Sequence, residues 1–156
     1  EVASTSGTSI DFTGIPAGVR QIVINFVGVS TNGTSIIKIQ LGDAGGIETS
    51  GYSGSTLSIN TTPTASISAH STGFLTEGIN GATIVLHGSI ILSLENSTTN
   101  TWAFTCGLGR SDVSTAVGGF GGGTKSLSAE LTQVRITTVN ETDAFDAGAI
   151  NIQYAP

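Results

Sequence analysis

Alternation of apolar and polar residues with a period of two is the feature that most constrains the fold of this chain. From Thr83 to Glu95 the even positions are large and apolar except at Gly88, and most odd positions are polar. After the polar stretch 96–100 the same phase resumes with Trp102, Phe104, Cys106 and Leu108. Residues that alternate in this way lie on opposite faces of a strand. We therefore predict a half-buried strand over 83–95, or two strands kinked near Gly88, joined by a turn to a second strand.

Shorter segments with the same alternation predict further strands, at 9–12, 21–26, 37–41, 127–131, 134–136 and 150–154. The phase slips between Thr132 and Gln133, which indicates a β-bulge or a tight bend. Residues 53–71 are interpreted as an edge strand followed by a loop, and the glycine-rich stretch 118–123 as a flexible loop or a close approach of two backbones. No segment has a helical period. The sequence predicts one all-β domain over 1–156, an antiparallel β-sandwich resembling a jelly roll.

The large apolar residues of the main phase are expected to form the core. They are Ile22, Ile24, Phe26, Ile37, Ile39, Leu92, Leu94, Trp102, Phe104, Leu108, Ile136 and Ile152. Trp102 is assigned to this core because it is in phase with Phe104, and a sugar-stacking platform is its alternative role. Tyr52 lies between Gly51 and Gly54 and is expected in an exposed loop.

Charge excludes several classes of partner. The net charge is −6, only 10% of residues are charged, and the five Lys and Arg residues form no cluster. Nucleic acid is therefore a poor partner, because binding along a phosphate backbone needs clustered cations.

No apolar run approaches the length of a membrane span, so membrane insertion is not expected. The single Cys106 excludes an internal disulfide and a multi-thiolate zinc site.

The chain contains no Met and begins with Glu1. A Glu that follows an initiator Met normally leaves that Met in place. We therefore expect the chain to be an excised or processed piece of a longer protein.

Motifs with catalytic potential are weak. The glycine run ending at Lys125 resembles a phosphate-binding loop, but Thr124 intrudes and the following residues alternate as a strand, whereas such a loop must open a helix. The two possible bases, His70 in a polar loop and His87 on an outward face, are interpreted as surface histidines. A catalytic triad needs a base held by a third group, and the spacing suggests none. We therefore expect that the protein is not an enzyme and binds no cofactor.

Acidic residues occur in two sets, Asp43 with Glu48, and Glu141 with Asp143 and Asp146. Either set offers the paired carboxyls of a glycoside hydrolase or the oxygen ligands of calcium. Both sets lie in Gly- and Ala-rich turns, where Asp commonly accepts hydrogen bonds from nearby backbone. The turn role is favoured, and no metal site is predicted.

Loop tips held by a rigid scaffold commonly carry recognition. The candidate ligand-binding residues are therefore Asp43, Glu48, Tyr52 and Phe120, which lie in 43–52 and 118–123. Four β-branched residues lie opposite the main core phase and would face solvent in a monomer. These residues, Val23, Val27, Val85 and Ile91, are the candidates for a subunit interface.

Several stretches together resemble the β-domain found at the C-terminal ends of tailed-bacteriophage fibre and spike proteins. They are DFTGIP at 11–16, INFVGVSTNGTS at 24–35, QLGDAGGIETSGY at 40–52, NTW at 100–102, VRITTVN at 134–140 and DAFDAGAINI at 143–152. The resemblance implies a homotrimeric virion module, attached to other virion proteins on a tail fibre, tailspike or head fibre, that binds a host-surface glycan or protein. It also implies assembly in the bacterial cytoplasm and exposure on the particle. A free, non-catalytic carbohydrate-binding module of bacterial origin is the alternative.

Overall fold

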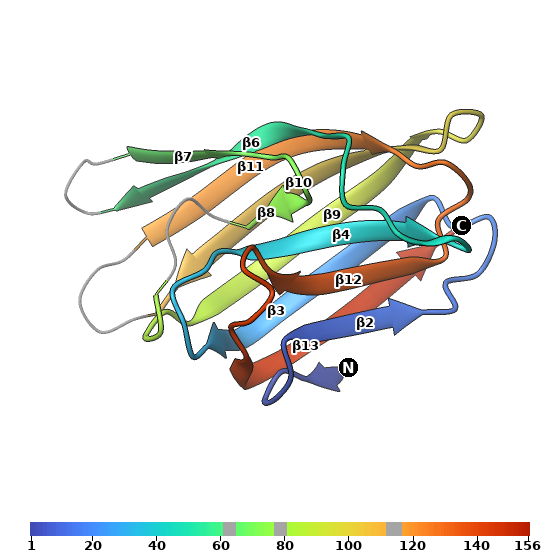
Figure 1. Ribbon diagram of the computed structural model, residues 1–156. Coiled ribbons are helices and arrows are strands. Elements are labelled where there is room, and N and C mark those ends of the chain that lie inside the picture. The colour runs from blue at the N-terminus through green and yellow to red at the C-terminus, as the bar shows by residue number, and fades with distance from the viewer. Residues whose placement is uncertain (61–64, 77–80, 112–116) are drawn as a thin grey trace.

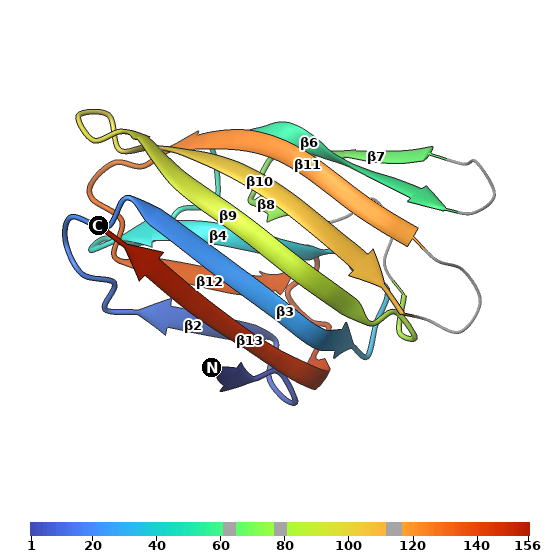
Figure 2. The same ribbon diagram turned by 180° about the vertical axis from the view of Figure 1, so that it is seen from behind.

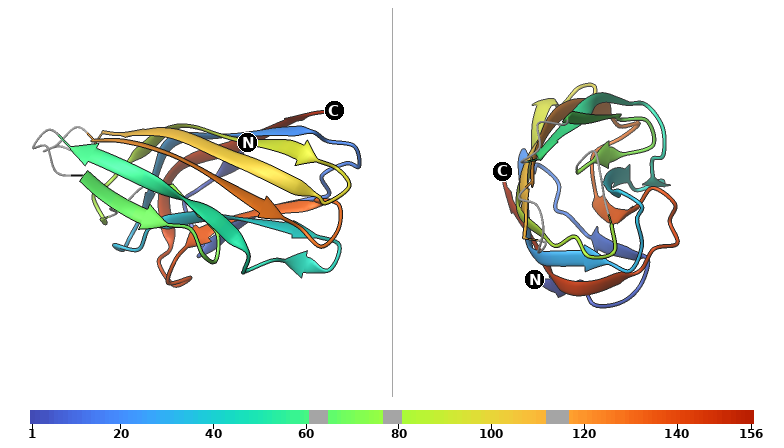
Figure 3. Two further views of the ribbon diagram at one scale, coloured as in Figure 1. Left: turned by 90° about the horizontal axis from the view of Figure 1, so that it is seen from above. Right: turned by 90° about the vertical axis from the view of Figure 1, so that its left-hand side faces the viewer.

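The computed structural model describes residues 1–60, 65–76, 81–111 and 117–156. Two antiparallel sheets pack face to face, and the described residues contain no helix (Figure 1). The predicted all-β sandwich is therefore confirmed. Seen along the strands, the larger sheet curves around the smaller one (Figure 3).

The larger sheet has eight strands in the order β1-β13-β3-β9-β10-β11-β6-β7. Their bounds are β1 Val2–Ala3, β13 Phe145–Ala155, β3 Gln21–Thr31, β9 Leu86–Asn96, β10 Thr101–Arg110, β11 Val117–Ser126, β6 Tyr52–Asn60 and β7 Ala65–Ala69. The smaller sheet has the order β2-β12-β4-β5, and β8 also pairs with β4. Its strands are β2 Ser9–Thr13, β12 Gln133–Thr138, β4 Ile37–Asp43, β5 Gly46–Ile47 and β8 Phe74–Leu75.

Early and late strands of the chain lie side by side in both sheets. β2 pairs with β12, and β13 pairs with both β1 and β3. This winding ties both ends of the chain into the sheets. It also brings the segment before β3, the turn between β9 and β10, and the connection after β11 to one end of the sandwich, on the right in Figure 1.

The core fills the space between the two sheets. Ten of the twelve expected core residues are buried, Trp102 among them, while Leu94 and Ile152 are half-buried and pack against the same cluster. Phe74 stacks on Phe104 with ring centroids 4.4 Å apart, and Tyr52 meets Phe74 edge-on. Offset and edge-on ring pairs stabilise a core beyond the area that they bury.

Of the two alternatives for 83–95, the structure has the single strand, and Gly88 is an irregular position within it. Gly88 has a φ of 130°, and a Cβ there would lie 2.3 Å from the carbonyl oxygen of Gly107 on the neighbouring strand. The pairing of β9 with β3 shifts register between Phe26 and Val29, directly beside this glycine. Only glycine fits this backbone conformation without strain.

The interpretation of 118–123 as a loop is wrong, because these residues form the middle of β11. The strand pairs with β10 on one side and with β6 on the other. The alternative, a close approach of backbones, is correct: a Cβ on Gly121 or Gly123 would lie within 2.8 Å of an atom of β6. Because glycine has no side chain, a glycine-rich strand shows no alternation of apolar and polar residues in the sequence.

Two expected strand boundaries are also wrong. Residues 127–131 are not a strand but a connection that buries Leu127 and Leu131 at the edge of the core. The strand expected from Thr83 begins only at Leu86. In 53–71, the expected edge strand is β7, and it forms a hairpin with β6.

Candidate ligand pocket and outer sheet face

Asp43, Glu48 and Tyr52 come together, as the sequence suggests, but as parts of an internal network. Asp43 accepts hydrogen bonds from the Gly45 backbone N–H at 2.7 Å and from the Ser128 hydroxyl at 2.6 Å. The Ser128 hydrogen bond, followed by that of Gly45, lowers the pKa of Asp43. Its carboxylate oxygens therefore hold the turn 43–45 against the connection after β11, which is the predicted turn role.

Glu48 forms an ion pair with Lys125 and accepts a hydrogen bond of 2.7 Å from the Ser128 backbone N–H. Burial raises the pKa of Glu48, but the hydrogen bonds from Lys125 and Ser128 and the charge of Lys125 together lower it by more. The net shift of the pKa is therefore downward. Lys125 is itself buried on the inward side of β11. The lysine of the phosphate-loop resemblance thus serves this ion pair.

The expectation of an exposed Tyr52 is wrong, because Tyr52 begins β6 and points into the core. Its hydroxyl accepts a hydrogen bond of 2.7 Å from the Leu41 N–H and donates one of 2.9 Å to the Glu48 carbonyl. Burial raises its pKa. Gly51, directly before β6, and Gly54, within β6, both have positive φ, and neither belongs to a loop tip.

The second acidic set also makes structural contacts. Glu141 pairs with the buried Lys38 at 2.7 Å, which lowers the pKa of Glu141. Asp143 accepts hydrogen bonds from the Asn140 amide and the Ser35 N–H, and Asp146 from the Ser30 hydroxyl. Within the described ranges, no group of three His, Cys, Asp or Glu side chains is placed to hold a metal ion.

The two histidines differ. His87 is exposed on β9, as expected, and contacts the Gly28 N–H and the Ser111 hydroxyl. The interpretation of His70 as a surface residue is wrong: it is buried edge-on against Phe74 and Phe104, with Nε2 2.9 Å from the Thr56 hydroxyl. Its chain neighbours are polar, but the hairpin turns its ring inward.

Phe120 lies on the outward side of β11 and is 55% exposed. We define the outer face as two rows of paired residues that cross the larger sheet, which faces the viewer in Figure 2, together with Val27, which follows these rows on β3. The rows are Gln153, Val23, Ile91, Thr105, Gly122, Ser55 and Ala69, and next to them Asn151, Asn25, Ser89, Gly107, Phe120, Leu57 and Ile67. Neither row contains a charged side chain.

The interface candidates divide into two groups. Val27 is 62% exposed and Ile91 is 39% exposed, whereas Val23 and Val85 are half-buried. Val23 and Ile91 are directly paired on the outer face, Val27 follows on β3, and Val85 precedes β9. Phe120 and Ile67 extend the exposed apolar surface of this face toward β7.

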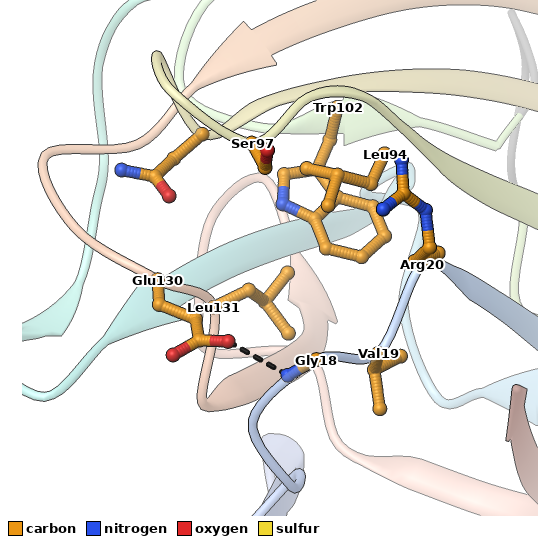
Figure 4. A pocket seen from close by; sticks show the side chains of 9 residues that line it. Gly18, Val19, Arg20, Leu94, Ser97, Trp102, Glu130 and Leu131 are labelled. Atoms are coloured by element: carbon orange, nitrogen blue, oxygen red, sulfur yellow. Dashed lines mark hydrogen bonds between the residues drawn. The ribbon is translucent and has the colours of Figure 1, made fainter. Parts of the chain in front are cut away.

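A pocket lies where three segments meet at the end of the sandwich described above. Its volume is about 310 Å³, and it is lined by Gly18, Val19, Arg20, Leu94, Ser97, Asn100, Trp102, Glu130 and Leu131 (Figure 4). Backbone hydrogen bonds fix the segments to one another, from Leu94 N–H to the Arg20 carbonyl and from Leu127 N–H to the Asn100 carbonyl. The walls are therefore parts of a rigid scaffold.

Polar groups without a protein partner gather in this pocket. Glu130 uses one carboxylate oxygen to accept a hydrogen bond of 2.8 Å from the Gly18 N–H. In the described part of the chain, the side chains of Arg20, Ser97 and Asn100 have no hydrogen-bond partner. The indole N–H of Trp102 is buried and also lacks one. A buried donor without a partner costs about 1–3 kcal/mol, so such a group marks a place where a ligand can be held.

Sequence reasoning missed Arg20 and Glu130. Each is a single charged residue in a connection, and they are 110 positions apart, so no local pattern joins them. Trp102 was correctly placed in the core, but its assignment did not anticipate that one edge of the ring also lines a pocket.

Comparisons of the chain with protein-family models, with curated protein sequences and with solved structures found no match. No helix able to span a membrane occurs in the parts of the chain that the structure describes.

Proposed function

We propose that this chain is a non-catalytic module of a bacteriophage fibre or spike, which assembles as a homotrimer on the virion and binds the host surface. The uncharged outer face of the larger sheet is the observation that carries this proposal. The segments that resemble phage fibre domains supply the biological setting and the number of subunits.

The outer face has the chemistry of a surface that a second copy of the chain covers. It presents Val27, Ile91, Phe120 and Ile67 to solvent, separated by Ser, Thr, Asn and Gly. Obligate interfaces resemble a core divided between subunits, and the cores of interfaces are depleted of charged residues. Because the chain carries a net charge of −6, copies meeting through uncharged faces keep their like charges apart.

Binding without catalysis agrees with how the carboxylates are used. Asp43, Glu48, Glu141, Asp143 and Asp146 each accept hydrogen bonds or form ion pairs that hold turns in place. A glycoside hydrolase of the usual kind needs two carboxyl groups that face a shared substrate. Of the acidic residues named here, only Glu130 lines the pocket.

A non-catalytic carbohydrate-binding module is the second candidate. The pocket beside Trp102 favours it, because an aromatic wall with several polar groups suits a sugar. The two candidates differ in oligomeric state, since free binding modules are usually monomers.

Sedimentation velocity on three proteins tests the proposal. The wild type is expected to sediment as one oligomer, and Ile91→Asp to dissociate it, because each interface would bury an unpaired charge. Val139→Asp is the matched control, because Val139 is 48% exposed beyond β12 and away from the outer face. A monomeric wild type, or an oligomer that Ile91→Asp leaves intact, contradicts the proposed assembly.

A further inference from the structure

We propose that the pocket formed by 18–20, 94–102 and 130–131 binds one unit of a neutral saccharide. The inference rests on the proposed function in one respect, since a receptor-binding module needs a site for its receptor. It names that site and the chemical class of its ligand, and it stands on the geometry around Trp102.

The polar groups of the pocket match a ligand whose groups both donate and accept hydrogen bonds. Arg20 and the Trp102 N–H are donors only, the second carboxylate oxygen of Glu130 is an acceptor only, and Asn100 and Ser97 do both. Sugar hydroxyls both donate and accept. A ligand with acceptors alone would leave Glu130 unsatisfied, and one with donors alone would leave Arg20 and Trp102 unsatisfied.

The apolar lining supplies the second requirement of a sugar site. Trp102, Leu94, Val19 and Leu131 line the pocket between the polar groups. Figure 4 shows the nitrogen-bearing edge of the Trp102 ring toward the side of Ser97 and Glu130, and Arg20 on the other side of the ring. A pyranose carries apolar C–H groups and polar hydroxyls in close alternation, so it matches walls of both kinds.

The volume limits the size of the ligand. At about 310 Å³ the pocket is at the lower end of the range of about 300–1,000 Å³ that small-molecule sites occupy. This space suits a single sugar unit better than an oligosaccharide, so the site recognises a terminal or branching residue of a larger glycan.

Charge selects neutral sugars over acidic ones. Glu130 lies in the pocket wall, and its contact with the Gly18 N–H holds the carboxylate in place. A sugar carboxylate or sulfate in this space would be repelled by Glu130, and the net charge of −6 adds to that repulsion. Arg20 lines the same pocket with an equal and opposite charge, so the preference for neutral sugars is expected to be small, and its guanidinium is free to donate to a hydroxyl.

Intrinsic fluorescence provides a direct test, because Trp102 is the only tryptophan of the chain. The intact wild-type protein is titrated with the methyl glycosides of glucose, galactose, mannose and N-acetylglucosamine, and with methyl glucuronide as the acidic probe. We expect at least one neutral glycoside to shift the emission in a saturable way at millimolar or lower concentration. Methyl glucuronide is expected to bind more weakly than methyl glucoside.

Three variants locate the site, with affinities measured by calorimetry. Arg20→Ala removes a charged hydrogen-bond donor and is expected to weaken neutral-sugar binding about tenfold or more. Glu130→Gln keeps an acceptor for the Gly18 N–H and is expected to raise the affinity for methyl glucuronide relative to methyl glucoside. Val139→Asp is the control, because Val139 is exposed beyond β12 and lies in neither the pocket lining nor the outer face, and it is expected to leave the affinity unchanged.

The proposal is overturned if none of the neutral glycosides changes the emission, if methyl glucuronide binds more tightly than methyl glucoside, or if Val139→Asp abolishes binding while Arg20→Ala does not. Sedimentation of the same samples separates this outcome from the proposed assembly. If the protein is an oligomer but its tryptophan emission does not change with any sugar, only the proposed sugar site is contradicted. If the protein is a monomer that binds a neutral sugar, only the proposed assembly is contradicted.

Discussion

His70 shows how a polar residue becomes part of an aromatic core. Its ring is buried between Phe74 and Phe104, Nε2 contacts Thr56, and Nδ1 has no hydrogen-bond partner. Burial therefore lowers the pKa of His70, because the charged form loses its hydration. The neutral ring is the form that the folded protein accommodates.

This burial predicts a pH dependence of stability. A histidine whose pKa is lower in the folded state binds protons preferentially when unfolded, so stability falls as the pH drops below about 6.5, the ordinary histidine value. We expect the melting temperature of the wild type to decrease from pH 7.5 to pH 5, above the range where carboxylates titrate. His70→Gln should show a smaller decrease over the same range. Equal slopes for the two proteins would refute this role of His70.

The Tyr52 hydroxyl joins β6 to β4 and to Glu48, the residue after β5. It accepts from the Leu41 N–H and donates to the Glu48 carbonyl, both through the protein interior. Tyr52→Phe leaves the buried Leu41 donor without this partner and should lower the free energy of unfolding by about 1–3 kcal/mol. Urea denaturation measures this loss, and a change below about 0.5 kcal/mol, the ordinary range of surface substitutions, would contradict it.

At the scale of elements, β11 illustrates where a strand forms without the usual pattern. Gly121 and Gly123 face inward, where a Cβ would meet the backbone of β6, whereas a Cβ on Gly122 would make only an ordinary contact of 3.6 Å with the Phe104 carbonyl. The strand is specified by close approach to its neighbours rather than by its own side chains.

Alanine substitutions along β11 should therefore differ sharply between adjacent positions. Gly123→Ala is expected to lower the free energy of unfolding by about 1–3 kcal/mol, because β6 or His70 must move to admit the methyl group. Gly122→Ala, its matched control, should stay within about 0.5 kcal/mol. Denaturation of both variants at one protein concentration makes the comparison, and similar losses would show that the spacing between β11 and β6 is not limiting.

Period-two alternation predicted β2, β3, β4, β9, β10, β12 and β13, because apolar residues alternate with other residues along each of them. In β4 the alternation is present in the sequence although both faces of the strand are buried. The pattern failed at β11, because glycines occupy many of its positions and have no side chain that could alternate. It also failed at 127–131, where Leu127 and Leu131 reach the core from an irregular connection. It also failed at Tyr52, since flanking glycines signal a turn even when a strand follows at once. The alternation could not predict the pocket, because Arg20, Trp102 and Glu130 come together only in the folded chain.

At the scale of the whole molecule, the distribution of charge separates two surfaces. The two outer-face rows carry no charged side chain, while Asp11 and Arg135 pair across the outward side of the smaller sheet, through two hydrogen bonds of 2.7 Å. The difference accords with one side being covered by other copies of the chain.

The mass of the purified chain in solution tests this account most directly. Multi-angle light scattering over a range of micromolar concentrations should give three times the 15.7 kDa of the single chain. The value should persist on dilution, because an interface across the outer face would bury Val27, Ile91 and Phe120 from each copy. A mass of one chain at every concentration would contradict the proposed assembly and leave the outer face uncovered.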